Sequence, residues 1–172
     1  ITMPSFGFST SGLADLAYDS NTQTFFGVSH SGTVGQPGTL VSIDISEVSL
    51  GGDPIVTTQT IVGTIVDEAI KSGIPVSAFG ATIIDGDGNV YIGANNADHD
   101  LDPTTPNEGG FYKITIGEDG ALYRELLAES PRVASNDGAM DTRGLDPFLG
   151  IDTSSTVLLR APVLSVAVAE DD

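Results

Sequence analysis

Short segments with the two-residue period of β-strands recur along the chain. Residues 40–44 (LVSID) and 111–115 (FYKIT) alternate apolar with polar side chains, which is the pattern of a strand with one buried face. Residues 24–28 (TFFGV) and 90–94 (VYIGA) are rich in aromatic and β-branched residues, which half-buried strands favour. The segment 85–89 (DGDGN) provides the positive-φ positions that a tight hairpin needs. The pattern therefore predicts an all-β fold of short strands joined by turns.

The chain also contains an internal repeat. Residues 16–30 (LAYDSNTQTFFGVSH) align without gaps on residues 82–96 (TIIDGDGNVYIGANN). The matched pairs, 66 positions apart, are Asp19 with Asp85, Phe25 with Tyr91, Phe26 with Ile92 and Gly27 with Gly93. Residues 39–44 then align on 110–115 at a spacing of 71, so the intervening loop is five residues longer in the second copy. Such self-similarity predicts a duplicated unit, although two generic hairpins that align by chance would give the same pattern.

Each copy predicts about four strands. A further strand-like segment follows each copy, at 54–67 and at 120–130. We therefore expect an antiparallel β-meander, twice over, in repeats at about 12–67 and 78–130 of a domain that spans residues 1–143. Among these segments, the hairpin turns would lie at one end of the sheet and the long loops at the other.

Two segments fall outside this pattern. Residues 66–73 (VDEAIKSG) carry a weak helical signal, with Asp67 as a candidate N-cap and Gly73 just past the end. Residues 144–172 break the repeat but contain good strand material, TVLLR and VLSVAVA. This C-terminal segment is expected to be a closing strand, the link to a following domain, or a strand that pairs with a neighbouring subunit.

The repeat resembles a known family. The pattern D-x-x-x-x-x-(F/Y)-x-G followed by (L/Y)-x-x-I resembles one blade of a bacterial β-propeller, and VYIGANN…FYKIT resembles the Tyr-Val-Thr-Asn (lactonase-like) repeats of secreted and surface proteins. The resemblance covers roughly residues 12–145 and implies blade-like meanders. Propellers need at least four blades, whereas two are legible here. The chain would then be part of a propeller, close with partner chains, or pack its two sheets as a sandwich.

The amino-acid composition limits the partners and the environment that can be expected for the protein. The 172 residues carry 24 acids against 6 bases, a formal net charge of −18, and contain no cysteine. One domain with a real core is expected, without disulfides. Nucleic acid is excluded as a partner because phosphate contacts need clustered Lys and Arg. No apolar run is long enough to insert into a membrane. The acidity fits a salty medium or bound divalent cations, and both favour an extracellular or cell-surface location.

The N-terminus carries no basic segment followed by an apolar run, so the sequence shows no signal peptide. We expect a processed chain or a piece of a larger protein.

Calcium is the cofactor that the acidic loops favour. Hard Ca²⁺ takes six to eight oxygen ligands, and the D-x-D-x-D spacing at 98–102 lets alternate carboxylates converge on one ion. The candidate ligands of this first site are Asn96, Asp98, Asp100, Asp102 and Glu108. The loop departs from an EF-hand because a proline takes the place of the turning glycine and the last acid comes one position early. A merely solvated acidic loop is the competing interpretation.

A second candidate calcium site lies at 85–89, with Asp85, Asp87 and Asn89 as ligands. Val90 occupies the position of the EF-hand glycine. A hairpin turn built from Asp, Gly and Asn needs no metal, so a purely structural turn is the stronger interpretation of this segment.

The loop-rich end of the sheet is the predicted binding face. His30 and His99 fall in equivalent loops of the two copies, and Asn136 and Asp137 follow in the next long loop. Each histidine could bind a transition metal or act as a general base, but neither has metal-binding spacing, which favours inert surface residues.

No catalytic constellation is legible. The chain lacks cysteine and the G-x-S-x-G motif, and no serine has a base close in sequence. The leading hypothesis is a non-enzymatic extracellular structural or adhesion module that calcium stabilises, part of a larger surface protein or assembly. Its partners would be a protein or glycan surface, or further copies through edge strands. The alternatives are a metal-dependent lactonase-like hydrolase that uses the loop face, and an acidic scaffold domain of a halophilic or marine protein.

Overall fold

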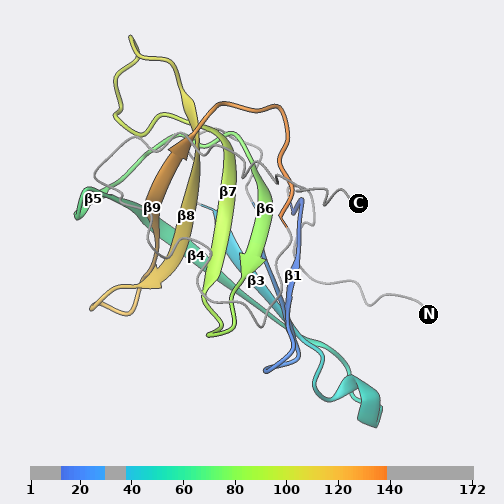
Figure 1. The fold of residues 1–172 in the computed structure, drawn as a ribbon. Coiled ribbons are helices and arrows are strands. Elements are labelled where there is room, and N and C mark those ends of the chain that lie inside the picture. The colour runs from blue at the N-terminus through green and yellow to red at the C-terminus, as the bar shows by residue number, and fades with distance from the viewer. Residues whose placement is uncertain (1–12, 30–37, 139–172) are drawn as a thin grey trace, which may run out of the picture.

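The computed structural model describes residues 13–29 and 38–138, which form nine β-strands and one short 3₁₀ helix (Figure 1). The elements are β1 (Ala17–Asp19), β2 (Thr24–Ser29), β3 (Thr39–Asp44), η1 (Val48–Leu50), β4 (Ile55–Val66), β5 (Ala69–Lys71), β6 (Phe79–Ile84), β7 (Val90–Ala97), β8 (Glu108–Ile116) and β9 (Leu122–Ser130). None of the described residues belongs to a helix that is long and apolar enough to cross a membrane.

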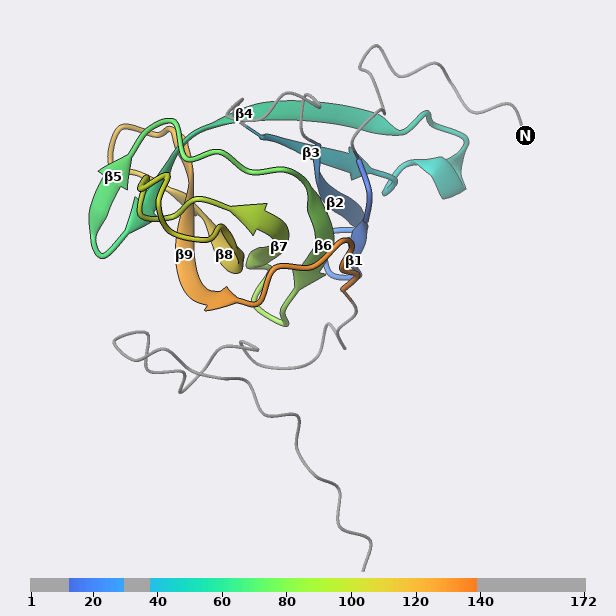
Figure 2. The ribbon, with the colours of Figure 1, turned by 90° about the horizontal axis from the view of Figure 1, so that it is seen from above.

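The strands form one mixed sheet that curls into a nearly closed barrel. Strands β1 to β4 make an antiparallel meander, and β6 to β9 make a second one. The last strands of the two meanders, β4 and β9, pair in parallel and join them. Figure 2 looks along the barrel and shows β1 and β6, the first strands of the two meanders, beside one another at the opposite side of the ring.

The all-β class and the two antiparallel meanders confirm the sequence prediction in part. The parallel pair β4–β9 was not predicted, and it produces a barrel in place of two blades. Propeller blades are separate four-stranded sheets around a channel, whereas these two meanders share one hydrogen-bonded sheet. A parallel pairing and a barrel are not specific to propellers, so the family resemblance stays an expectation.

Around the barrel the two meanders run in opposite directions, β1-β2-β3-β4 and then β9-β8-β7-β6. Equivalent residues of the repeat nevertheless face the interior, since Phe26 and Val28 of β2 contact the same core as Ile92 and Ala94 of β7. Because β4 and β9 are parallel, no rotation can superimpose the strand order, the strand direction and the inward face at the same time. The repeat therefore describes the local sequence of each hairpin but not the arrangement of the two meanders.

The strand register corrects one detail of the alignment. Phe26 pairs with Ser42, and its counterpart Ile92 pairs with Tyr112. Positions 42 and 112 differ by 70 and not by the predicted 71. The second copy is thus longer by four residues up to this point. The alignment is therefore one residue out of step in β8, and it places an adjacent residue at the inward position that Tyr112 occupies.

The predicted helix at 66–73 is wrong, because this segment is a β-hairpin. Val66 of β4 pairs with Ala69 of β5, and Asp67 and Glu68 between them have φ values of 50° and 63°. Positive φ at both central residues defines a type I′ turn, which matches the twist of the flanking strands. The acidic residues that suggested a helix start therefore occupy left-handed turn positions.

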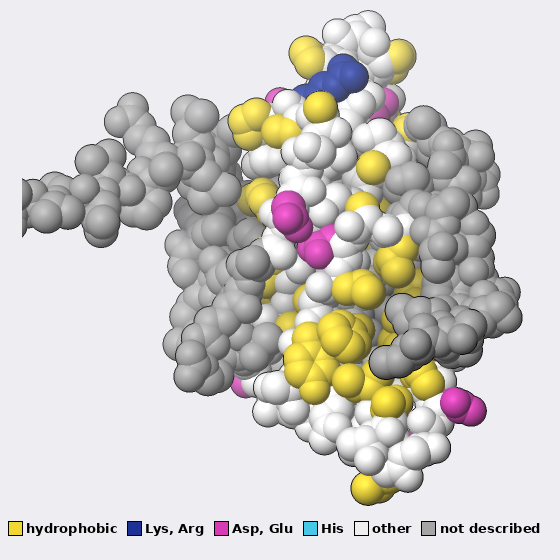
Figure 3. Space-filling view, turned by 90° about the vertical axis from the view of Figure 1, so that its right-hand side faces the viewer, with side chains coloured by type: hydrophobic (Ala, Val, Ile, Leu, Met, Phe, Trp, Pro, Cys, Tyr) yellow, Lys and Arg dark blue, Asp and Glu magenta, His cyan; other side chains and the backbone are white. Residues whose placement is uncertain are grey.

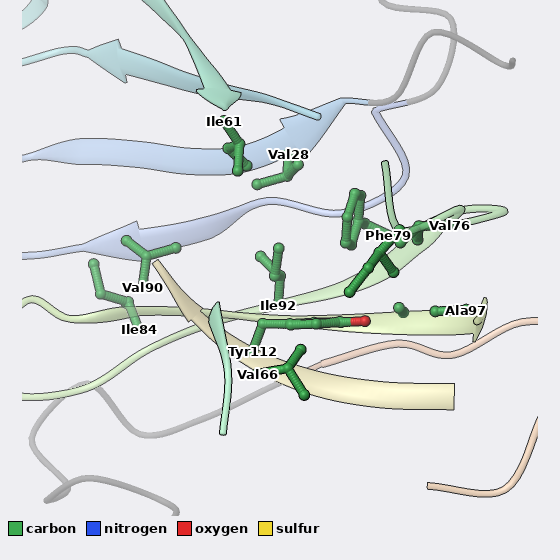
Figure 4. Packing of buried hydrophobic residues seen from close by; sticks show 12 residues of the cluster. Val28, Ile61, Val66, Val76, Phe79, Ile84, Val90, Ile92, Ala97 and Tyr112 are labelled. Carbon is green, nitrogen blue, oxygen red and sulfur yellow. The ribbon is translucent and has the colours of Figure 1, made fainter. Parts of the chain in front are cut away.

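Side chains from both meanders fill the barrel. Tyr112 is fully buried at its centre, with Phe79 at 6.4 Å between ring centroids in an edge-on arrangement (Figure 4). The buried apolar cluster is Val28, Ile61, Val66, Ile74, Val76, Phe79, Ile84, Val90, Ile92, Ala94, Ala97 and Tyr112. Because these residues come from five of the strands and from the segment before β6, the cluster holds the two meanders together by burial as well as by hydrogen bonds.

At the side of the barrel where β1 meets β6, the carboxylate of Asp15 accepts a hydrogen bond from the Thr82 N–H at 2.6 Å. We call the place where β1 and β6 meet the seam of the barrel. A side-chain hydrogen bond joins the two edges of the sheet there, in place of a ladder of backbone hydrogen bonds. Figure 3 views the molecule from this side and shows a group of apolar side chains on the surface. Leu16 and Tyr18 are among the exposed apolar residues, and the Tyr18 ring lies 4.7 Å from that of Phe25.

Candidate functional site

Several of the long connections lie at one end of the barrel, as the meander pattern predicts. The β7–β8 loop (98–107), the segment 72–78 and the start of the segment 131–138 lie at the upper end in Figure 1, and the β4–β5 turn lies at the left. The β1–β2, β6–β7 and β8–β9 turns lie at the lower end, as does the long β3–β4 connection that contains η1. Five carboxylates act on one another or on His99 electrostatically. We call this group the acidic rim; its members are Asp67, Asp98, Asp100, Glu108 and Glu129.

The acids of the loop 98–107 hold the loop itself together. Asp100 accepts hydrogen bonds from the Asp102 N–H at 2.9 Å and from the Thr105 hydroxyl at 2.8 Å. Asp102 accepts from both the N–H and the hydroxyl of Thr104, at 2.8 and 2.7 Å. The N–H of Asp102 and the hydroxyl of Thr105 lower the pKa of Asp100. Consecutive Asx turns therefore account for the alternate aspartates without requiring an ion.

Two glutamates of the acidic rim face one another. Glu108 begins β8, Glu129 lies near the end of β9, and their carboxyl groups share a hydrogen bond. Partial burial of the Glu129 carboxyl, this hydrogen bond and the charges of Glu108, Asp100 and Asp67 all raise the pKa of Glu129. The Glu129 carboxyl therefore keeps a proton more readily than an isolated glutamate does, and a bound cation could replace that proton.

His99 is buried, not exposed as expected for an inert surface residue. Its side chain is 6% exposed, with Nε2 at 3.1 Å from the Gly109 carbonyl oxygen and Nδ1 at 3.1 Å from the Tyr112 hydroxyl. Because a carbonyl can only accept, Nε2 donates, and Nδ1 accepts from the tyrosine. Both ring nitrogens of the neutral imidazole are thus engaged. Burial is the largest of the effects that lower its pKa.

Arg124 extends this polar group into the barrel. It is 4% exposed and donates from Nε to the Thr64 hydroxyl at 2.7 Å and from a terminal nitrogen to the Ile74 carbonyl at 3.1 Å. Its guanidinium carbon lies 5.5 Å from the ring centroid of Phe79 and 5.6 Å from that of Tyr112. Hydroxyl, carbonyl and ring faces therefore surround a buried cation at the centre of the core.

The second candidate calcium site is a hydrogen-bonded turn. Asp85 is 1% exposed and accepts from the Asp87 N–H, from the N–H and side chain of Asn89, and from the Tyr91 hydroxyl, at 2.8–2.9 Å. Burial raises the pKa of Asp85, but these hydrogen bonds outweigh it and the pKa lies below its ordinary value. The equivalent Asp19 accepts from the two residues that follow Ser20, so both copies fix this turn with a buried aspartate.

The remaining predicted binding-face residues lie apart from the acidic rim. Asn136 lies on the outer face of β6 and β7, where it contacts Gly80 and Gly93. Asp137 is exposed and accepts from the Gly138 N–H. Asn96 is partly buried in β7, and its side-chain oxygen has no hydrogen-bond partner among the described residues. His30 and the C-terminal segment 144–172 lie outside the described residues.

The structure thus brings together Asp98, Asp100 and Glu108 of the first candidate site and separates them from Asn136 and Asp137. Sequence reasoning missed Glu129 and Arg124. Arg124 had a usable signal, because it alternates with Leu122 and Leu126 and so takes an inward position of β9. Within residues 13–29 and 38–138, no three His, Asp or Glu side chains are grouped so that they could hold one metal ion as they stand.

Comparison of the chain with protein-family models, with curated proteins and with solved structures finds no match.

Proposed function

We propose that the protein is a non-enzymatic structural or adhesion module of an extracellular or cell-surface protein, stabilised by calcium at its acidic rim. One observation supports the non-enzymatic assignment: three buried polar side chains that could perform chemistry hold the fold together. His99 uses both ring nitrogens, Arg124 is enclosed in the core, and Asp85 accepts four hydrogen bonds within its turn. Groups engaged in this way are not available to a substrate.

The acidic rim supports the proposal that calcium stabilises the protein. Partial burial raises the pKa of Glu129 most, followed by its hydrogen bond with Glu108 and by the charges of Glu108, Asp100 and Asp67. Calcium binds such carboxylates through six to eight oxygens and tolerates irregular geometry. An ion there would remove the like-charge repulsion, and the exposed side chains of the rim would have to move to ligate it. Asp98 and Asp100 of the neighbouring loop are the next available ligands.

Thermal unfolding in EDTA and in CaCl₂ tests this proposal. We expect calcium to raise the Tm of the wild-type protein. Glu129→Gln should raise the Tm in EDTA, because it removes a repelling charge, and should reduce the rise in Tm on adding calcium by the part that comes from the rim. Asp100→Asn keeps the hydrogen-bond acceptor of its turn but loses a ligand charge, and should weaken the calcium effect as well.

Asp53→Asn is the matched control. Asp53 is exposed in the connection between η1 and β4, at the other end of the molecule, and the substitution changes the net charge equally. It should leave the calcium effect intact. Equal calcium effects in all four proteins would mean that calcium acts by general screening of charge or at another place on the protein, and would contradict a rim site.

In the alternative of a metal-dependent lactonase-like hydrolase that uses the loop face, His99 could act as a base only by leaving one of its hydrogen-bond partners. Partners of the proposed module would be a protein or glycan surface, or further copies of the chain. The exposed apolar side chains Leu16 and Tyr18 near the seam of the barrel, and Val62 and Ile70 on the β4–β5 hairpin, support a surface that other molecules contact.

A further inference from the structure

Residues 131–138 cross the outer face of the second meander as a strap. They leave the end of β9, pass over the top of the barrel and descend beside β6 (orange in Figure 1). The Val133 N–H donates to the Asn95 carbonyl at 3.1 Å, and the Asn95 side-chain nitrogen donates to the Ala134 carbonyl at 3.3 Å. Asn95 is therefore the residue of β7 that fixes the strap, and its amide orientation is set because only its nitrogen can donate to a carbonyl.

Two glycines make room for the next part of the strap. A Cβ at Gly93 would lie 2.8 Å from the side-chain nitrogen of Asn136, and a Cβ at Gly80 would collide with Asn136 Oδ1. Neither glycine has a positive φ, so the requirement is for space and not for backbone conformation. Asn136 thus occupies the space that side chains on β6 and β7 would otherwise fill.

Three oxygen atoms lie close to Gly80. The position that a Cβ of Gly80 would take lies 2.6 Å from the Asn136 carbonyl oxygen and 3.0 Å from Asn95 Oδ1, and Asn136 Oδ1 is closer still. Asn95 is 8% exposed. Both side-chain oxygens are buried, and neither accepts a hydrogen bond from any residue in the described part of the chain. Buried acceptors without a partner are costly, and oxygen atoms that lie close to one another repel.

We propose that Asn95 Oδ1, Asn136 Oδ1 and the Asn136 carbonyl oxygen bind a hard cation, which fastens the strap to the outer face of the barrel. Amide and backbone carbonyl oxygens are ordinary ligands of calcium, and water completes the coordination shell. A single water offers two donors to three acceptors, whereas a cation satisfies all three. The chain's net charge of −18 further concentrates cations at its surface.

This strap site shares no ligand with the acidic rim, so the two can be tested separately. Asn136→Ala removes one ligand from a partly exposed side chain and leaves the strap backbone in place. Asn136→Asp has the same shape and adds a ligand charge. The probes are CaCl₂ and NaCl, with choline chloride at equal ionic strength as the control for screening, and the readouts are calorimetric titration of calcium and the Tm.

We expect wild-type protein to gain about 5–10 °C in Tm at a calcium concentration one hundred times the Kd of the strap site. Asn136→Ala should lose this gain, and Asn136→Asp should bind calcium about tenfold more tightly, because the charge of the ligands sets calcium affinity. Glu129→Gln, which alters the rim, should leave the strap site unchanged. A gain with NaCl that matches the gain with CaCl₂ and exceeds that with choline would identify sodium as the bound ion.

Two results would overturn the proposal. One is an Asn136→Asp protein that is less stable than wild type in every salt, since a buried carboxylate without a cation is destabilising. The other is an equal response of wild type and Asn136→Ala to all three salts, which would mean that only water satisfies these oxygens.

Discussion

The environment of His99 predicts a measurable dependence of folding stability on pH. Burial, together with the charge of the nearby Arg124, lowers its pKa more than its hydrogen bond to Gly109 and the charges of Glu108 and Asp98 raise it. An unfolded histidine takes up a proton near pH 6.5, whereas folded His99 does so only at lower pH. Between these values the unfolded state binds more protons. Stability from the neutral imidazole is therefore complete above pH 6.5 and is lost as the pH falls.

The free energy of unfolding should accordingly decrease between pH 7 and pH 5, by up to about 1.4 kcal/mol per pH unit from this one group. The carboxylates also titrate at the acid end, so the measurement is a difference. His99→Gln can donate to Gly109 and accept from Tyr112 without titrating. Urea unfolding of both proteins at several pH values should show the steeper loss only in wild type; parallel curves would refute a depressed pKa.

At the scale of single elements, the β4–β5 hairpin is the clearest departure from ideal local chemistry. Its type I′ turn places Asp67 and Glu68 at positive φ, where side chains other than Gly or Asn are strained. We expect Glu68→Gly to raise the free energy of unfolding by about 0.5–1 kcal/mol, because relief of the strain exceeds the added entropy of the unfolded chain. Glu68→Gln removes the same charge without relieving the strain. If both variants gain equally in urea unfolding, charge and not backbone strain is the cause.

This hairpin also shows where sequence reasoning at the element scale succeeds and fails. The alternating and β-branched segments predicted β2, β3, β7 and β8, because half-buried strands need that pattern wherever they lie. The sequence of this hairpin predicts a helix because Asp67 and Gly73 resemble helix-terminal residues and the two turn positions contain no glycine. The first candidate calcium loop was found by its charge, but Thr104 and Thr105, which engage its aspartates, became informative only in the structure.

At the scale of the molecule, the closure of the sheet could not be predicted. The side-chain period tells which residues face the core but not which strand is the neighbour. Whether β4 pairs with β6 or with β9 depends on contacts between segments far apart in sequence, such as Thr64 with Arg124. The glycines of the repeat indicate one part of this arrangement, namely where other segments cross the sheet. Gly27 lies beneath residues 13–16 and Gly93 beneath Asn136, so both copies use the glycine to let another segment cross the outer face.

The charge of the whole molecule leads to the last prediction. With a net charge of −18, the described fold brings acids together at the rim, and the resulting repulsion is long-ranged at low ionic strength. The screening length falls from about 30 Å at 0.01 M salt to about 3 Å at 1 M. We expect the Tm to rise by several degrees over this range in choline chloride as well as in NaCl, with most of the rise below about 0.2 M. An acidic scaffold adapted to high salt would behave differently, because its Tm would continue to rise at molar NaCl. A Tm that is flat in both salts would show that the acids are too far apart to oppose folding, and would remove the electrostatic reason for a cation at the rim.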